Sequence, residues 1–135
     1  MIEDIKTRKN IKIGKQYEHY IEWLLKQDGW DVSSRSQYGK YDRGIDIIAT
    51  KGDAKRYIQC KGWSYRHSRI HEDVVSQLFG SVASLEGIDA LKTAEMYIYS
   101  STVPTPYAKE KADKLNIHFV HSSFPLWKRK KKLVQ

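Results

Sequence analysis

Three polar side chains lie inside two segments that are otherwise typical of an apolar core. Asp46 is in the run GIDIIA, and Gln59 and Lys61 are two residues apart in the run YIQCKGW. On a strand, alternate side chains share a face, so the spacing predicts that Gln59 and Lys61 point the same way. If the two runs pair as neighbouring strands, Asp46 reaches the same patch. The pattern predicts that a carboxylate, an amide and an ammonium converge at one end of a sheet.

These groups suit metal-assisted hydrolysis of a phosphodiester bond. Carboxylate and amide oxygens are hard ligands for Mg²⁺ or Mn²⁺. A metal held there would polarise the phosphate and activate water, and Lys61 would stabilise the charge that develops in the transition state. Glu18, at the edge of the apolar stripe of a predicted helix, can add a second carboxylate. The structural alternatives are that Asp46 satisfies backbone groups at a strand end, Lys61 is an edge lysine and Glu18 is a helix-surface glutamate.

The apolar periodicity of the chain predicts helices and strands that would position these groups. The expected helices are 13–28, 71–86 and 107–115, and the expected strands are 30–35, 45–50, 56–63, 95–101 and 117–121. Thr105 and Pro106 supply the cap and the first residue of the last helix. Gly52 and Asp53 supply hairpin-turn chemistry between the second and third strands. The order αβββαβαβ predicts an α/β fold with a mixed β-sheet flanked by helices.

Length and charge narrow the class of protein. The 135 residues fit one domain, 1–135, with a basic tail at 127–135. The net charge of +8 includes basic clusters at 6–15, 51–61 and 128–132. Such a balance favours a polyanionic partner, most simply nucleic acid, with a solvated basic surface as the alternative.

The cysteine content and the lack of long apolar runs both predict a cytoplasmic protein. Cys60 has no second cysteine with which to form an internal disulfide or a cysteine-rich zinc site, which favours a reducing compartment. We expect Cys60 to be a small core residue. No apolar run approaches the roughly 20 residues of a membrane span, and the N-terminus MIEDIKTRKN has no apolar signal region. We therefore expect a cytoplasmic protein, from a prokaryote or a phage or viral host, with no membrane partner.

The segments around these residues also resemble a known family. The segments are GKQYEHYIEWLLKQDGWDV, YDRGIDIIA, YIQCKGW, EDVVSQLFGSVAS and YIYSSTVPTPYAKEKADKLNI. Together they resemble the catalytic domain of the Mrr-like restriction endonucleases, in the PD-(D/E)XK nuclease superfamily, over roughly residues 13–121. The fold of that superfamily has the order αβββαβαβ. The chain departs from the pattern in two ways: no proline precedes Asp46, and Gln59 replaces the second acid, as it often does in Mrr-like proteins.

The resemblance implies a Mg²⁺-dependent DNA endonuclease, with Mn²⁺ as a substitute. It implies that Glu18 takes part, so that the catalytic residues are Glu18, Asp46, Gln59 and Lys61, and the metal ligands are Glu18, Asp46, Gln59 and the Cys60 backbone carbonyl. The chain has no room for the separate DNA-recognition domain that Mrr-like proteins usually carry, and its size is similar to archaeal Holliday-junction resolvases and small phage nucleases. Restriction, cleavage of branched junctions and homing-type cleavage remain open, as does a non-catalytic nucleic-acid-binding module.

Two loops that flank the predicted site mix basic and aromatic residues. The candidates for DNA contact, to duplex or branched DNA, are Arg35, Tyr38, Lys40, Tyr41, Arg43, Tyr65, Arg66 and Arg69. Such residues hold phosphates and stack on unpaired bases, although aromatic loops also pack on their own domain. One site cuts one strand, so a homodimer or a dimer of dimers is expected for double-strand cleavage.

The remaining polar residues of interest have simpler interpretations. Gln77, on the second predicted helix, is a candidate to face the site, but we interpret it as part of a polar helix surface. The pairs His67 and His71, and His118 and His121, have no further ligands near them in the sequence. We interpret these histidines as surface or core residues, because a metal pair needs additional ligands.

Overall fold

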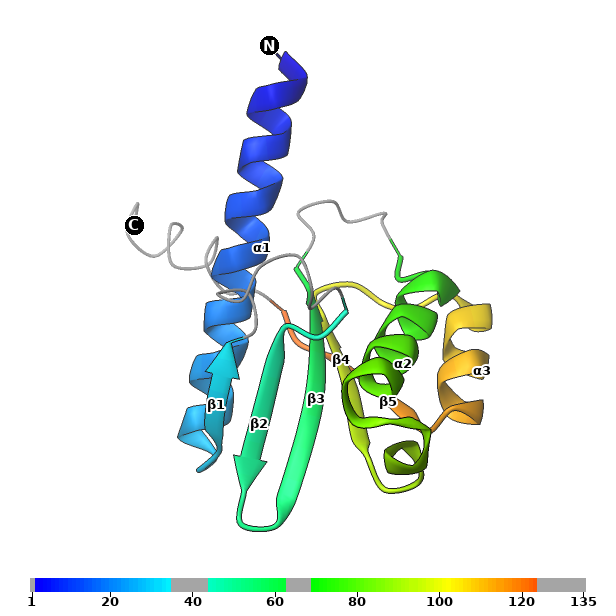
Figure 1. Cartoon of the computed structure of the whole chain (residues 1–135). Coiled ribbons are helices and arrows are strands. Elements are labelled where there is room, and N and C mark those ends of the chain that lie inside the picture. The colour runs from blue at the N-terminus through cyan, green and yellow to red at the C-terminus, as the bar shows by residue number, and fades with distance from the viewer. Residues whose placement is uncertain (1, 35–43, 63–68, 124–135) are drawn as a thin grey trace.

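The computed structural model describes residues 2–34, 44–62 and 69–123 and has the predicted order of elements (Figure 1). The elements are α1 (Ile2–Gln27), β1 (Asp31–Ser34), β2 (Ile47–Lys51), β3 (Ala54–Lys61), α2 (Glu72–Glu86), the 3₁₀ helix η2 (Ile88–Lys92), β4 (Glu95–Ser100), α3 (Pro106–Lys114) and β5 (Ile117–His121). Apart from the unpredicted η2, this confirms the αβββαβαβ fold. Within the described ranges, no helix is both long enough and apolar enough to cross a membrane.

The five strands form one mixed sheet in the order β1-β2-β3-β4-β5. The β1–β2 and β2–β3 pairs are antiparallel, whereas β3–β4 and β4–β5 are parallel. The carboxyl ends of β3, β4 and β5 therefore meet at the same edge of the sheet. Because β2 runs the other way, it begins at that edge, with Ile47 opposite Ile58. Asp46, the residue before β2, is thereby brought beside Gln59 and Cys60.

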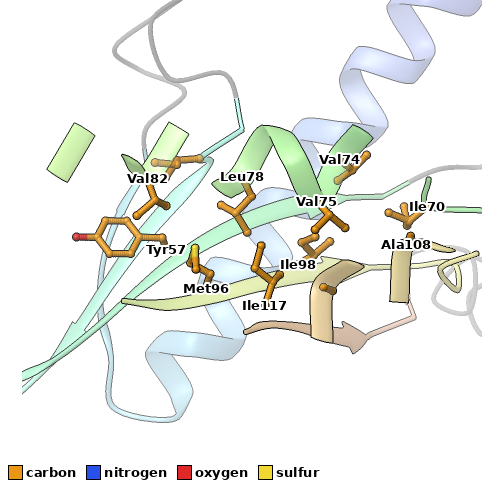
Figure 2. Packing of buried hydrophobic residues seen from close by; sticks show 12 residues of the cluster. Tyr57, Ile70, Val74, Val75, Leu78, Val82, Met96, Ile98, Ala108 and Ile117 are labelled. Atoms are coloured by element: carbon orange, nitrogen blue, oxygen red, sulfur yellow. The ribbon is translucent and has the colours of Figure 1, made fainter. Parts of the chain in front are cut away.

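Helices cover both faces of the sheet, and each face has its own apolar core (Figure 1). The core under α1 includes Tyr17, Ile21, Leu25, Ile47, Ile58 and Cys60. The core under α2 and α3 includes Val75, Leu78, Met96, Ile98 and Ala108 (Figure 2). Alternation along β3 sends Ile58 and Cys60 toward α1, and Tyr57 and Gln59 toward α2. The predicted division of side chains between the two faces of β3 is confirmed.

Helix α1 begins at Ile2, which makes the predicted start at residue 13 wrong. From residue 14 on, where the burial of the side chains is described, the first buried position of this helix is Tyr17, and Figure 1 shows its N-terminal part extending beyond the sheet. An apolar stripe marks only the turns that face a core, whereas a helix propagates through polar residues of good helix propensity. The predicted stop is confirmed: the helix ends at Gln27, and Gly29 follows with φ +88°.

The β2–β3 hairpin is tighter than predicted, because Lys51 already pairs with Ala54. The turn is left to Gly52, with φ +59°, and Asp53. Both strands therefore extend further into the predicted KGDAK connection, and β3 ends two residues earlier than expected. The predicted start of α3 is confirmed, since the Thr105 side chain accepts a hydrogen bond from the Ala108 N–H at 3.1 Å.

Candidate active site

The Asp46 carboxylate is held by the backbone of the neighbouring strand. The Asp46 N–H donates to the Ile58 carbonyl at 2.8 Å, and Asp46 Oδ2 accepts from the Cys60 N–H at 2.7 Å. These two bonds fix both the main chain and the side chain of Asp46 against β3. The predicted convergence of Asp46 with the end of β3 is thus present in the structure.

The turn before Asp46 packs closely on α2 and requires glycine. Gly44 has φ +98°, a conformation that side chains with a Cβ rarely adopt. A Cβ on Gly44 would lie 2.8 Å from both the Gln77 carbonyl oxygen and Ser81 Oγ. The absence of a side chain therefore lets this turn rest on the α2 backbone and sets the position from which Asp46 starts.

Glu18 reaches Asp46 from the other face of the sheet. The half-buried Glu18 carboxyl shares a side-chain hydrogen bond with Asp46. Burial, together with the charges of Asp46 and Glu22, raises the pKa of Glu18 to about 8. The pKa of Asp46 is raised by burial, against the opposing effects of the Cys60 N–H and the Lys61 ammonium. Because the pKa values of both carboxyl groups are raised, the pair retains a proton more readily than two separate carboxyl groups would.

The Gln59 side chain is a buried amide whose nitrogen has a hydrogen-bond partner and whose oxygen has none among the described residues. Its side chain is only 2 % exposed, and its Nε2 donates to Gln77 Oε1 at 3.2 Å. Gln59 Oε1 is buried and has no hydrogen-bond partner among the residues that the structure describes. A buried acceptor without a partner costs about 1–3 kcal/mol, so this oxygen would gain from a hydrogen-bond donor or a cation.

Lys61 lies at the end of β3, two residues beyond Gln59 and half-buried. Its charge lowers the pKa of Asp46, which places the ammonium within electrostatic reach of the carboxyl pair. The Lys61 carbonyl accepts from the Ser101 N–H at 3.1 Å and from Ser101 Oγ at 3.5 Å. Residues just beyond β4 therefore fix the end of the strand that carries Lys61.

The assembled groups fit a hard divalent cation. They offer two carboxyl groups that repel each other when ionised and a buried amide oxygen in need of a positive partner. In the described part of the chain, no three histidine, cysteine, aspartate or glutamate side chains form a metal-ligand cluster. Gln59 as the source of a third side-chain oxygen stays a prediction. The Cys60 carbonyl as a further ligand stays a prediction.

Cys60 itself is confirmed as a core residue. Its side chain is buried in the cluster under α1, and burial raises the pKa of its thiol well above the ordinary value. A thiol that resists ionisation is a poor nucleophile and a poor metal ligand. The sulfur therefore takes no part in the chemistry of the site.

Gln77, which the sequence interpretation preferred to assign to a polar helix surface, contacts a residue of the predicted site. It is exposed, as a polar helix surface requires, but its side chain also accepts the hydrogen bond of Gln59. The available signal was its place directly before Leu78 and four residues before Ser81, at the edge of the apolar face of α2. That signal is weak, because many helix-edge glutamines have no buried partner.

The other predicted residues fall largely outside the described ranges. Of the candidates for DNA contact, only Arg69 is described, and it is exposed. Arg35, Tyr38, Lys40, Tyr41, Arg43, Tyr65 and Arg66 lie outside the described residues, as does His67.

The described histidines have ordinary surroundings. His71 is exposed, the His118 ring lies 4.9 Å from the Tyr97 ring, and His121 Nε2 lies 3.1 Å from the Ser101 carbonyl oxygen. No described histidine belongs to a metal-ligand cluster among the residues with described placement. All three are exposed, which agrees with the surface alternative of their interpretation as surface or core residues.

The sequence and the fold are both similar to those of known nucleases and related proteins. The family model Mrr_cat, described as restriction endonuclease, matches residues 11–123. Among solved structures, the protein of unknown function AF1548 has a TM-score of 0.61 at 15% identity, over 77% of this chain and 55% of that one. No match was found among curated proteins.

Two further solved structures are similar over most of this chain. A repair endonuclease from Pyrococcus abyssi has a TM-score of 0.55 at 14% identity, over 81% of this chain and 46% of that one. EndoMS in its apo form has a TM-score of 0.52 at 13% identity, over 81% and 47% respectively. At these identities the likeness concerns the fold, and the chain spans about half the length of each protein.

Proposed function

This chain belongs to the restriction endonuclease family Mrr_cat, and from that premise we propose that it is a Mg²⁺-dependent endonuclease that hydrolyses phosphodiester bonds in DNA. The observation that carries the proposal is the carboxyl pair of Glu18 and Asp46 at the end of β3, the strand on which the buried Gln59 Oε1 has no partner among the described residues. A protein that only bound DNA would gain nothing from this costly arrangement. A cation would relieve both the carboxyl repulsion and the unpartnered oxygen.

The residues that would hold the metal come from both faces of the sheet. Glu18, Asp46 and Gln59 Oε1 are the proposed side-chain ligands, and the Cys60 carbonyl is the proposed backbone ligand. Mg²⁺, or Mn²⁺ in its place, would supply Lewis-acid polarisation of the phosphate and would lower the pKa of the attacking water.

The chain itself supplies orientation, charge and control of protons. The Cys60 N–H aims one oxygen of Asp46, which leaves the other oxygen for a ligand. Glu18 must lose its proton before it can act as a ligand, so metal binding releases a proton from this pair. The Lys61 ammonium is placed to neutralise charge on the scissile phosphate as it develops.

The proposed partner is DNA. The net charge of +8 suits a polyanion, and the exposed Arg69 follows the segment that leaves β3. The seven further loop residues named in the sequence analysis are proposed contacts to phosphates and bases. One similar fold belongs to a protein named as a repair endonuclease, and duplex and branched DNA are both substrates to test.

Assembly as a homodimer, or a dimer of dimers, is part of the proposal. The chain contributes one set of Asp46, Gln59 and Lys61, and a cut through both strands needs two such sets at a fixed separation. Light scattering with and without DNA measures the assembly. A monomer in both conditions that only nicks its substrates would refute the dimer and leave a nickase.

The test of the function is cleavage of linear, methylated, branched and single-stranded DNA with Mg²⁺, Mn²⁺ or a chelator. The expected result is metal-dependent cutting of at least one of these substrates. Binding of DNA without cleavage of any of them, under conditions in which the protein binds Mg²⁺ or Mn²⁺, would overturn the enzyme and favour the non-catalytic module.

A further inference from the structure

The hydrogen bond between two glutamines explains how a neutral residue can stand where an acid is expected. We propose that Gln77 is a positioning residue, which accepts the bond from Gln59 Nε2 and so turns Gln59 Oε1 toward the cation site. The inference rests on the proposed function, because it concerns the ligand set of the same site.

An amide at position 59 has a difficulty that a carboxylate does not have. The two oxygens of a carboxylate are alike, whereas an amide offers oxygen at one end and an N–H₂ group at the other. If Nε2 faced the site, it would place hydrogen-bond donors where a cation should lie. The orientation of Gln59 therefore decides whether the site has a third side-chain oxygen, and a neighbour that accepts from Nε2 selects the productive orientation.

Gln77 also supports the site through its backbone, and the two roles are separable. The Gln77 carbonyl oxygen would lie only 2.8 Å from a Cβ on Gly44, so the α2 backbone packs directly against the turn that leads to Asp46. Any substitution of the Gln77 side chain leaves this backbone contact in place. Changes at position 77 consequently report on the amide pair rather than on the position of Asp46.

The central experiment compares Gln77→Met with the wild type. Methionine has similar length and no charge but cannot accept the bond in place of Oε1. Titration with Mn²⁺ or Mg²⁺ in a calorimeter should show about fivefold weaker affinity in the variant, which is the scale of one hydrogen bond. In a Gln59→Glu background the same substitution should change the affinity by less than about twofold, because a carboxylate has no wrong end.

Two variants on the same helix are matched controls. Gln77→Glu keeps an acceptor at the same place, so the affinity for Mn²⁺ should equal or exceed that of the wild type. Ser76→Ala removes an exposed hydroxyl that donates to the Glu72 carbonyl within α2, so it should leave the affinity unchanged. A loss in Ser76→Ala as large as in Gln77→Met would assign the effect to the helix and overturn the role of the amide pair.

A measurement without metal separates this inference from the proposed function. The Gln59 side-chain N–H₂ protons should exchange slowly with solvent in the wild type and Gln77→Glu, and at least about tenfold faster in Gln77→Met. Faster exchange in a protein that binds neither cation would overturn the metal role while confirming the contact. Unchanged exchange and unchanged affinity in Gln77→Met would overturn the positioning role, and the endonuclease proposal would stand.

Discussion

Charged side chains are compensated differently at the two ends of β3: an arginine has an acidic partner at one end, and two acids lie together at the other. At the amino end, Arg56 Nε lies 3.4 Å from Glu95 Oε2, and its guanidinium lies 4.2 Å and 4.5 Å from the rings of Trp30 and Tyr97. At the carboxyl end, Glu18 and Asp46 place two acids together.

The unpartnered Gln59 oxygen adds to the cost at the carboxyl end. The contrast indicates that the amino end stabilises the fold, whereas the carboxyl end holds polar groups that the described residues compensate poorly. Natural sequences concentrate such locally unfavourable choices at functional sites.

The strongest test of this contrast is Asp46→Asn at the carboxyl end. The amide oxygen of asparagine can still accept from the Cys60 N–H, so the fold should be retained while the anion is lost. We expect cleavage to fall by more than about a thousandfold, together with loss of Mg²⁺ binding. Nicking of supercoiled plasmid and calorimetry measure the two effects. A variant that keeps its Mg²⁺ affinity would exclude Asp46 as a ligand.

Lys61→Ala should produce the next largest effect, and it should separate catalysis from metal binding. Removal of one ammonium that stabilises developing charge should slow cleavage by about 10²–10³-fold. DNA binding should change little, because Lys61 is one of 24 lysines and arginines. Single-turnover cleavage and fluorescence anisotropy give the two quantities. Cutting at the wild-type rate would remove Lys61 from the mechanism.

The close packing behind the site can be tested with two glycines that contact or belong to α2. Gly44→Ala must accommodate a Cβ 2.8 Å from the Gln77 carbonyl oxygen at φ +98°, so the free energy of unfolding should fall by about 2–4 kcal/mol. Gly80→Ala lies within α2 with open space around its Cβ and should stabilise by about 0.5–1 kcal/mol. Urea unfolding measures both. An equal change in the free energy of unfolding for the two variants would show that the turn before Asp46 can accommodate a Cβ without loss of stability.

The strand end of the site is easier to predict from sequence than its helix contacts, for a physical reason. Alternation along a strand decides which face each side chain takes, and hairpin pairing is local, so spacing alone predicts that Asp46, Gln59 and Lys61 converge. The hydrogen bond of Gln77 depends on where α2 packs across the sheet, which no local pattern encodes. The first turns of α1 were missed because a helix can extend without burying an apolar face.

Glu18→Gln tests the same contrast through the pH dependence of stability, and the sign of its effect distinguishes the two ends of β3. The pKa of Glu18 is about 8 in the folded protein against 4.5 as the ordinary value, so between these pH values the folded state holds a proton that the unfolded state has lost. The stability of the metal-free protein should therefore fall as the pH rises from about 4.5 to about 8. In the Glu18→Gln variant, stability should fall less with rising pH. A smaller fall should remain, because the pKa of Asp46 is also raised.

The matched control for this substitution is Glu95→Gln at the amino end. It removes an acid that is paired with Arg56, so the variant should lose up to about 1 kcal/mol across the same pH range, as surface pairs do. Urea midpoints at pH 5, 6, 7 and 8 in the presence of a chelator test both variants. At pH 8 the Glu18 variant should be more stable than the wild type and the Glu95 variant less stable. If both variants lose stability at pH 8, the acids at the carboxyl end of β3 are as well satisfied as those at the amino end, and the reason for placing a cation there disappears.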